Sequence, residues 1–196
     1  MDKFQNKYRI PSTRLPHWDY GWNAVYFVTI CTGGQQHHFG GIVDDAMWLS
    51  DVGEIANACW MDIPLHFPFV HLDGFVIMPN HVHGIIMIES PRRDAIYRVS
   101  DKPRLYGAER VSTENSIPTS GGFAGNKNPM RQENLSKIIR WYKGRVTFES
   151  RKITPDFCWQ PRFYEHIVRS EKTLEAIRNY ILANPWNWKR DSLFSP

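Results

Sequence analysis

The chain has 196 residues, of which 42% are apolar and 22% are charged, and its formal net charge is +4. These values are close to the averages of globular proteins and exclude a chain that is disordered throughout. The three cysteines, Cys31, Cys59 and Cys158, form no CxxC pair, which argues against a cysteine zinc site or a disulfide framework. No run of about eighteen apolar residues and no signal-peptide core occurs, so we expect a cytoplasmic protein without a membrane span.

The positive charge is concentrated in the second half of the chain. Residues 1–90 carry a net charge of −5, residues 91–130 carry +3, and residues 131–190 carry +7. A basic half indicates a polyanionic partner, of which nucleic acid is the commonest. A solvated helix face gives the same pattern, so charge alone leaves both interpretations open.

The first third of the chain predicts a strand, a hairpin and a helix behind an irregular leader. Residues 1–23 show no periodic pattern, whereas residues 24–31 form a β-branched and aromatic run that is typical of a buried strand. Residues 40–49 predict a hairpin that turns at two adjacent aspartates. A capping-box pattern at Asp51-x-x-Glu54 predicts a helix that runs to about residue 66.

The rest of the chain predicts three strands and two helices, interrupted by one aperiodic segment. The strands are expected at 69–78, 82–88 and 162–169, and the helices at 131–150 and 171–183. Residues 90–130 are rich in Ser, Thr, Gly and Asn and predict a mobile insertion, not a domain boundary. This order predicts a single α+β domain over residues 1–196, with one sheet and helices packed on one of its faces.

Two histidines share one face of a predicted strand. Side chains alternate along a strand, so His81 and His83 point to the same side while Val82 points to the core. Two adjacent imidazoles can chelate a divalent ion, and they resist double protonation because like charges repel. A pair of half-exposed surface histidines is the plainer interpretation, and the pair alone does not decide between them.

A tyrosine and an asparagine share one face of the last predicted helix. Tyr180 and Asn184 are four residues apart. An amide oxygen suits Mg²⁺ or Mn²⁺, and two imidazoles with one such oxygen leave positions open for a substrate phosphate. Tyr180 could then attack that phosphate as a nucleophile. Equally, Tyr180 could be an ordinary helix residue, and Asn184 could only end the helix before Pro185.

Three segments resemble the single-tyrosine HUH transposases, in which U is a bulky apolar residue. They are residues 75–84 (FVIMPNHVHG), 159–169 (WQPRFYEHIVR) and 180–185 (YILANP), and the strand around residues 26–30 fits the same pattern. Together they are similar to the branch called REP-associated tyrosine transposases. The resemblance covers most of residues 20–190 apart from the predicted insertion.

The resemblance implies a ferredoxin-like antiparallel sheet of the HUH endonuclease type with helices on one face. It also implies a metal-dependent enzyme that nicks and joins single-stranded DNA beside a hairpin, such as a REP-like palindrome. His81, His83 and Asn184 take the places of the ligands of Mg²⁺ or Mn²⁺, and Tyr180 takes the place of the nucleophile that forms a 5′-phosphotyrosine. The protein is then expected to be nucleoid-associated, with a monomer favoured over a homodimer.

Residues of the basic half extend this hypothesis to DNA contacts and to proton transfer. Trp159 or Phe163 could stack on an unpaired base, although either could equally be a core residue. Glu165 and His166 could take the proton of Tyr180, or could belong to a purely structural edge strand. Phosphate contacts are expected from Arg140, Lys143, Arg145, Arg162 and Arg169.

Two other tyrosines compete for the role of nucleophile. Tyr142 repeats with the apolar residues of its predicted helix, which indicates a core position. Tyr164 has no oxygen ligand one helical turn behind it, so Tyr180 is the predicted nucleophile.

Two other functions stay open on the sequence alone. A metal-dependent phosphodiesterase would use His81 and His83 to activate water and would form no covalent adduct. A non-catalytic protein that binds hairpin nucleic acid would show strong salt dependence and would ignore metal. The lack of an acidic cluster weighs against the first, and the presence of all four site residues weighs against the second.

Overall fold

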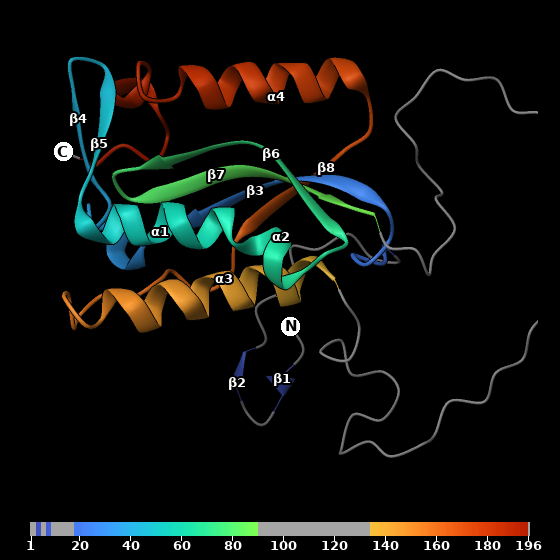
Figure 1. Cartoon of the computed structure of the whole chain (residues 1–196), viewed down its shortest axis with the longest axis horizontal. Helices are drawn as coiled ribbons and strands as arrows, with labels where there is room; N and C mark the ends of the chain where they lie inside the picture. The colour runs from blue at the N-terminus through green and yellow to red at the C-terminus, as the bar shows by residue number, and fades with distance from the viewer. Residues whose placement is uncertain (1–2, 5–6, 9–17, 90–133, 196) are drawn as a thin grey trace, which may run out of the picture.

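A four-stranded antiparallel sheet forms the centre of the structure, a computed structural model that describes residues 3–4, 7–8, 18–89 and 134–195 (Figure 1). The strand order is β6-β7-β3-β8. Most of the predicted leader and the predicted insertion at 90–130 lie outside the described residues; in the leader, β1 (Lys3–Phe4) pairs with β2 (Lys7–Tyr8). The sheet strands are β3 (Ala24–Cys31), β6 (Val70–Met78), β7 (His81–Ile88) and β8 (Tyr164–Val168).

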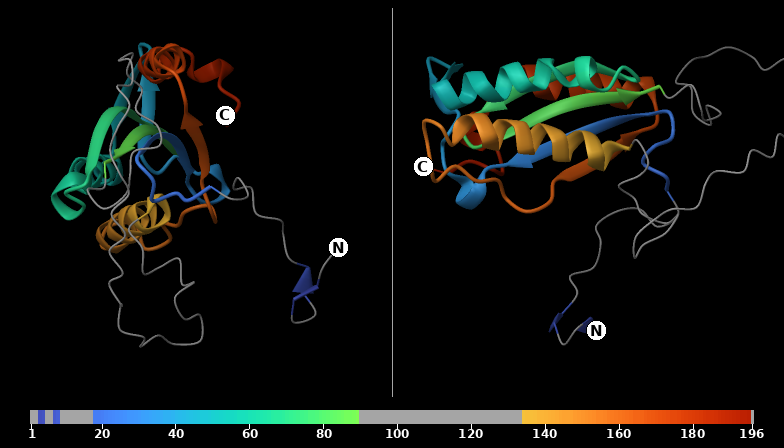
Figure 2. Two further views of the ribbon diagram at one scale, coloured as in Figure 1. Left: turned by 90° about the vertical axis from the view of Figure 1, so that its right-hand side faces the viewer. Right: turned by 60° about the horizontal axis from the view of Figure 1, so that its bottom comes forward.

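Two helical connections each join strands that are not neighbours in the sheet. Helix α1 (Asp51–Met61) and the short α2 (Ile63–His66) lie between β3 and β6, and α3 (Leu135–Ser150) lies between β7 and β8. Right-handed crossovers between parallel strands place both connections on the same face of the sheet, where α1 and α3 lie side by side (Figure 2). This βαββαβ arrangement is the ferredoxin-like fold, which confirms the predicted fold class.

The main core lies between the sheet and helices α1 and α3. Trp60 of α1 and Tyr142 of α3 are fully buried and meet edge to face, with ring centroids 5.2 Å apart. The predicted core position of Tyr142 is therefore confirmed. Gly84 of β7 lies under the indole of Trp60, and a Cβ added there would lie 2.2 Å from the ring. The glycine that follows the second histidine therefore makes room for the core.

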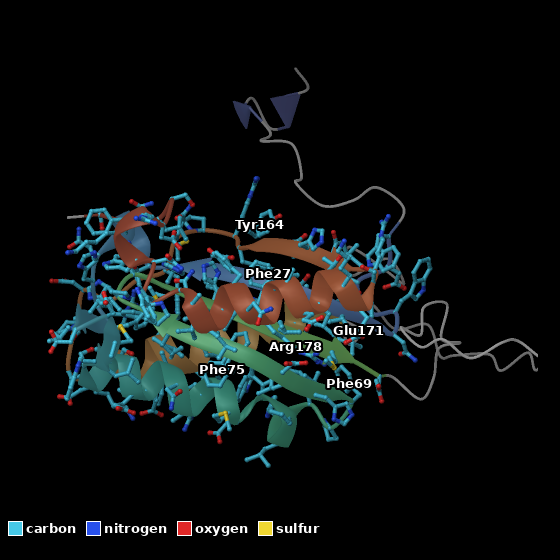
Figure 3. The ribbon with its side chains drawn as sticks, turned by 90° about the horizontal axis from the view of Figure 1, so that it is seen from above. Phe27, Phe69, Phe75, Tyr164, Glu171 and Arg178 are labelled. Atoms are coloured by element: carbon cyan, nitrogen blue, oxygen red, sulfur yellow. The ribbon has the colours of Figure 1, made fainter. Side chains whose placement is uncertain are left out.

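Helix α4 (Glu171–Ala183) covers the opposite face of the sheet (Figures 1 and 3). Its Leu174 and Ile181 pack against Phe27 of β3 and Ile85 of β7. The prediction that all helices lie on one face therefore holds for α1 and α3 only. The crossover rule does not constrain a helix that follows the last strand, and the second face of β3 and β7 is also apolar, so α4 buries it.

An ion pair attaches α4 to the edge strand β6. Arg178 donates from Nε to both carboxylate oxygens of Asp73 at 3.1 Å, and from Nη2 to one of them at 2.6 Å. This hydrogen-bonded guanidinium lowers the pKa of Asp73. Asp73 lies where the pairing of β6 with β7 shifts register. The contact fixes a point of α4 two residues before Tyr180, so it helps to position that side chain.

The predicted hairpin and first helix are both present, but the helix has a different N-cap and is divided in two. Strands β4 (Gly40–Val43) and β5 (Ala46–Leu49) pair across a turn whose two aspartates both have positive φ, as the expected turn requires. The helix is capped by the hydroxyl of Ser50, one residue before the predicted start. It ends at Asp62 because Pro64 has no N–H to continue the helical hydrogen bonds, so two helices stand where one was expected.

Among the described residues, no helix combines the length and the apolar character that crossing a bilayer requires.

Candidate active site

The two histidines lie at the start of β7, on the face that α4 covers. The turn at Pro79-Asn80 reverses the chain from β6, so His81 is the first residue of the returning strand. The ring centroids of His81 and His83 are 4.4 Å apart, which confirms that both point to the same side. Their side chains are buried, with 0% and 3% exposure, so the interpretation as half-exposed surface histidines is wrong.

Hydrogen bonds to the Nδ1 atoms fix the orientation of both imidazoles. The amide nitrogen of Asn80 donates to the carbonyl of Leu193, so its Oδ1 faces Nδ1 of His81 at 2.8 Å and accepts a hydrogen bond from the Nδ1–H there. Nε2 of His81 is then the unprotonated nitrogen, and it is buried without a hydrogen-bond partner among the described residues. Nδ1 of His83 lies 2.8 Å from the hydroxyl of Thr29 on the neighbouring strand. Both rings thus present Nε2 to the site.

Helix α4 brings Tyr180 against the histidine pair, and Asn184 follows directly at the end of the same helix. The hydroxyl of Tyr180 lies 3.1 Å from Nε2 of His83, and its side chain is 45% exposed, so the phenol is open to solvent on one side. Asn184 is buried at the end of the helix, and its Oδ1 has no hydrogen-bond donor among the residues that the structure describes. Four sequence-predicted residues therefore meet in one place, from two elements that are about 100 positions apart in the chain.

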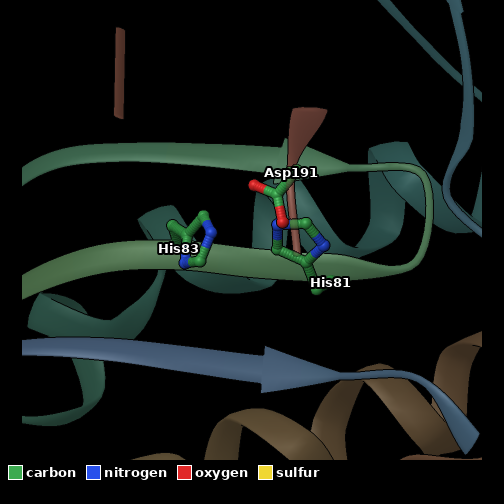
Figure 4. Close-up of side chains that lie close together, drawn as sticks. All are labelled: His81, His83 and Asp191. Atoms are coloured by element: carbon green, nitrogen blue, oxygen red, sulfur yellow. The ribbon is translucent and has the colours of Figure 1, made fainter. Parts of the chain in front are cut away.

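An aspartate that sequence reasoning missed completes the group. Asp191 follows the short turn η3 (Trp188–Arg190), and it lies beside His81 and His83 (Figure 4). Its Oδ2 accepts hydrogen bonds from Tyr180 at 3.2 Å and from Asn184 at 3.1 Å. No motif marks this residue, because only the packing of the C-terminal segment brings it to the site.

Burial keeps both imidazoles neutral at physiological pH. Burial and the neighbouring ring of His83 lower the pKa of His81 to about 3, against a smaller opposing effect of Asp191. Burial lowers the pKa of His83 to about 4. A neutral imidazole has a free lone pair, so both side chains can act as metal ligands without first losing a proton.

The acidic and phenolic groups of the site influence each other. Burial and the nearby carboxylate of Asp191 raise the pKa of Tyr180 above 10, while the amide of Asn184 acts in the opposite direction. Burial alone would raise the pKa of Asp191, but hydrogen bonds from the Leu193 N–H and from Asn184, together with the two imidazoles, hold that pKa below its usual value. At neutral pH the site therefore holds a phenol beside a carboxylate.

The side chains present fit a divalent cation. One ligand atom from each of His81, His83 and Asp191 lies within 4.8 Å of the others, which is slightly wider than the separation of about 4.2 Å between two opposite ligands bound at about 2.1 Å. Among the described residues, no donor reaches the buried acceptors Nε2 of His81 and Oδ1 of Asn184, which is costly unless a cation or water satisfies them. Two imidazoles with carboxylate and amide oxygens form a mixed donor set that suits Mn²⁺, and the oxygens suit Mg²⁺.

A cleft of about 720 Å³ opens beside this group, and we call it the Tyr180 cleft. It is lined by Phe27 and Thr29 of β3 and by Tyr180 of α4. The segment 160–165, which leads into β8, also lines it. The phenol hydroxyl is therefore reached from a cavity large enough for part of a nucleic-acid strand.

Two predicted DNA contacts are engaged in the protein itself. Nζ of Lys143 donates to the carbonyls of Gln160 at 2.7 Å and Arg162 at 3.0 Å, so it holds the segment that leads to β8. The indole of Trp159 packs on the main core, and its Nε1 donates to the carbonyl of Lys143 at 3.1 Å. Both side chains have structural contacts that explain their presence. Phe163 also packs against the core from the wall of the cleft.

The remaining predicted DNA contacts lie on two different faces. Arg140 and Arg145 are exposed on α3, on the side of the sheet opposite Tyr180, and Arg145 pairs with Glu149. Arg162 lines the Tyr180 cleft, and Arg169 is exposed just after β8. The structure thus does not bring these arginines together into one patch.

The two predicted proton acceptors do not contact the phenol. Glu165 lines the cleft and His166 is exposed on β8, but the hydrogen bonds of the Tyr180 hydroxyl among the described residues go to His83 and Asp191. The nearest base to the phenol is therefore one of these two.

A known structure shares this fold. The structure of a REP-associated tyrosine transposase bound to a REP hairpin matches 90% of this chain and 74% of its own chain, with a TM-score of 0.54 and 16% identity. A likeness at this identity shows a common fold. A crystal structure from Deinococcus radiodurans covers 87% of this chain at a TM-score of 0.44 and 13% identity, which is too weak to support an argument.

Sequence comparison identifies a relative along nearly the whole chain. No family model matches the chain. A Haemophilus influenzae protein described only as an uncharacterized protein is 38% identical over 184 residues, which covers 93% of this chain and 92% of that protein. The chain therefore belongs to the same protein family as this Haemophilus influenzae protein.

Proposed function

We propose that the protein is a metal-dependent enzyme of the single-tyrosine HUH type that nicks and joins single-stranded DNA beside a hairpin. One observation carries the proposal: the half-exposed hydroxyl of Tyr180 lies 3.1 Å from Nε2 of His83, inside a buried group of potential metal ligands. A tyrosine with only a structural role would not need a neutral imidazole, a carboxylate and a cleft around its hydroxyl.

In this proposal, Tyr180 attacks the scissile phosphate. A bond forms between the phenolic oxygen and phosphorus, the bond from phosphorus to the 3′-oxygen breaks, and the products are a 5′-phosphotyrosine and a 3′-hydroxyl. The phenolic proton passes to Asp191, whose Oδ2 lies 3.2 Å away, and is finally carried by the 3′-hydroxyl. A second 3′-hydroxyl can reverse the step and join strands.

We assign the metal ligands to His81, His83 and Asn184, with Asp191 as an additional carboxylate within reach. When held by these residues, Mg²⁺ or Mn²⁺ would supply a Lewis acid for the phosphate and would offset charge that develops on it. Asn80 and Thr29 hold the imidazoles with Nε2 toward the site, so the ligands are oriented before a cation or substrate arrives. Ligation by Nε2 of His83 would also release the phenol from its hydrogen bond to that nitrogen.

The fold and the cleft support DNA as the substrate. The transposase with the same fold was solved with a REP hairpin, which makes hairpin DNA the first substrate class to test. The 720 Å³ of the Tyr180 cleft is on the scale of a small-molecule pocket and accommodates unpaired nucleotides. We propose a monomer as the active unit, with α4 packed on the sheet of the same chain.

The test is the formation of a covalent protein–DNA adduct. The protein is incubated with Mn²⁺ and labelled pools of single-stranded DNA that carry a hairpin with randomised flanks, and the products are separated on a denaturing gel. We expect an adduct that chelator abolishes and that Tyr180→Phe abolishes. Tyr142→Phe is the matched control, because Tyr142 loses only a hydroxyl that bonds to the carbonyl of Ala56 in the core.

The same gel distinguishes the other functions. Cleavage that survives Tyr180→Phe without any adduct would favour a metal-dependent phosphodiesterase that uses water. Binding with strong salt dependence, no cleavage and no response to metal would favour a non-catalytic hairpin-binding protein. Either result overturns the proposed transferase.

A further inference from the structure

We propose that Tyr164 is a stacking platform for one unpaired DNA base next to the scissile phosphate. This inference rests on the proposed function, because it names how the same site holds its substrate. It assigns a role to a tyrosine that the proposed chemistry does not use. The occupant is a single unpaired nucleotide of a DNA strand that lies along the Tyr180 cleft.

The register of the sheet places Tyr164 in one row with the catalytic group. Thr29 of β3 pairs with His83 of β7 on one side and with Tyr164 of β8 on the other. Residues paired across a sheet point to the same face, and Thr29 does contact His83 through its hydroxyl. Tyr164 therefore lies on the α4 side of the sheet, two strand spacings, or about 9.5 Å, from His83.

The cleft lies between the two tyrosines. Tyr180 on α4 and Tyr164 on β8 both line the cleft, together with Phe27 and Thr29 of the strand β3 that pairs with β8. In Figure 3, Phe27 appears between Tyr164 and helix α4. When the scissile phosphate of a DNA strand lies at the hydroxyl of Tyr180, the neighbouring base of that DNA lies over Phe27 and Thr29, within reach of the ring of Tyr164.

The ring of Tyr164 is free to receive a base. Its side chain is 60% exposed, although it belongs to a strand whose later residues Ile167 and Val168 are buried. A tyrosine face stacks on any base, since every base has a π-face, and this contact carries little sequence preference. Polar side chains at the rim, Gln35, Gln160 and Arg162, can accompany the sugar and phosphate groups of the same strand.

The size of the cleft excludes a base-paired stem from this position. A volume of about 720 Å³ is within the range of pockets for small ligands, and its walls stand on adjacent elements of the sheet face. Along its grooves a duplex presents its bases edge-on, and it offers a free base face only at the end of the stem. A nucleotide in the single-stranded flank has a free face wherever it lies, so the flank is the expected partner of Tyr164.

The test uses protein that carries Tyr180→Phe, without metal, so that binding is observed apart from chemistry. The probe is a single-stranded DNA hairpin with a single-stranded flank, in which 2-aminopurine replaces the base at each flank position in turn. Stacking on a tyrosine changes the fluorescence of 2-aminopurine at the stacked position. We expect one flank position to respond, and the response to disappear when Tyr164→Leu is added.

Two further variants separate stacking from other effects. Tyr164→Phe keeps the aromatic face and should keep the fluorescence response. Trp48→Leu removes a ring of similar exposure, 66%, from β5 outside the cleft and should change nothing. Loss of one stacked base should weaken binding of the hairpin roughly 5- to 100-fold.

The outcomes separate this inference from the proposed function. The stacking role would be overturned if the fluorescence response were the same with and without Tyr164→Leu. If protein that retains Tyr180 still formed the adduct normally, the proposed enzyme would remain intact. A folded protein that binds no single-stranded or hairpin DNA would overturn both.

Discussion

Breaking the ion pair between Asp73 and Arg178 should loosen α4 from the sheet. Asp73→Asn keeps an acceptor for the backbone N–H of Gly74 but removes the charge that faces the guanidinium. Three N–H···O contacts join the two side chains, and hydrogen bonds to charged groups contribute about 1.5–3 kcal/mol. Arg178 is 39% exposed, so water screens part of this energy, and we expect a loss of about 1–2 kcal/mol.

The loss should appear in urea and thermal unfolding. A change of about 1–2 kcal/mol lowers the Tm of a chain of this size by roughly 2–8 °C. A double-mutant cycle with Arg178→Met should give a coupling free energy near the full effect, because each variant removes the same contact. Adduct formation should slow by more than the unfolded fraction explains, since α4 carries Tyr180.

The pH dependence of this difference has a definite sign. The pKa of Asp73 is lower in the folded protein than its usual value of 3.8, so the pair stabilises the fold above about pH 4. This contribution disappears as the pH falls through the folded pKa. The variant and the parent should therefore differ equally at pH 7 and pH 5 and converge at lower pH. A coupling energy near zero at pH 7, or a difference that grows on acidification, would refute the reasoning.

Three further predictions concern strand β7, with Gly144 of α3 as the control for the third. Mn²⁺ should raise the Tm equally at pH 7.5 and pH 5.5, because burial holds the pKa values of His81 and His83 at about 3 and about 4. A Tm increase with Mn²⁺ that vanishes by pH 6 would instead indicate exposed histidines. Without metal, stability should fall from about pH 6.5 toward pH 4, as only the unfolded chain takes up these protons. Gly84→Ala should destabilise the fold by about 1–3 kcal/mol, because the added Cβ clashes with Trp60. Gly144→Ala should instead stabilise α3 by about 0.5–1 kcal/mol in urea unfolding, because a Cβ there has no described atom within 4 Å. Equal effects of the two substitutions would contradict the packing argument.

Local patterns predicted the elements of the fold because each pattern reflects a local cause. The β-branched run at residues 24–31 is a buried strand, and the helix expected at residues 171–183 is α4. The side of the sheet that α4 occupies could not be predicted, because it depends on which face of the strands is still uncovered after both crossovers. The break at Asp62 was missed, although Pro64 was visible in the sequence.

The site residues that could be predicted are those that follow the regular spacing of a strand or a helix. Alternation along a strand placed His81 and His83 on one side, and helical spacing placed Tyr180 and Asn184 on one face. Asp191 belongs to no such repeat, and only the fold of the C-terminal segment brings it to the phenol.

Long basic and aromatic side chains were the least predictable from sequence. Lys143 was expected to contact phosphate, but its ammonium group bonds to carbonyls of the segment before β8. Trp159 was expected to stack on a base, but it packs on the core. Such side chains suit a DNA surface and a protein interior equally well, so residue type alone does not distinguish the two.

The central claim is that Tyr180 is the nucleophile, and peptide mapping of the protein–DNA adduct tests it most directly. After nuclease and trypsin digestion, mass spectrometry should find the residual 5′-linked nucleotide on the peptide of residues 179–189, which contains Tyr180. A nucleotide on the peptide of residues 163–169, which contains Tyr164, or cleaved DNA without any modified peptide, would contradict the account.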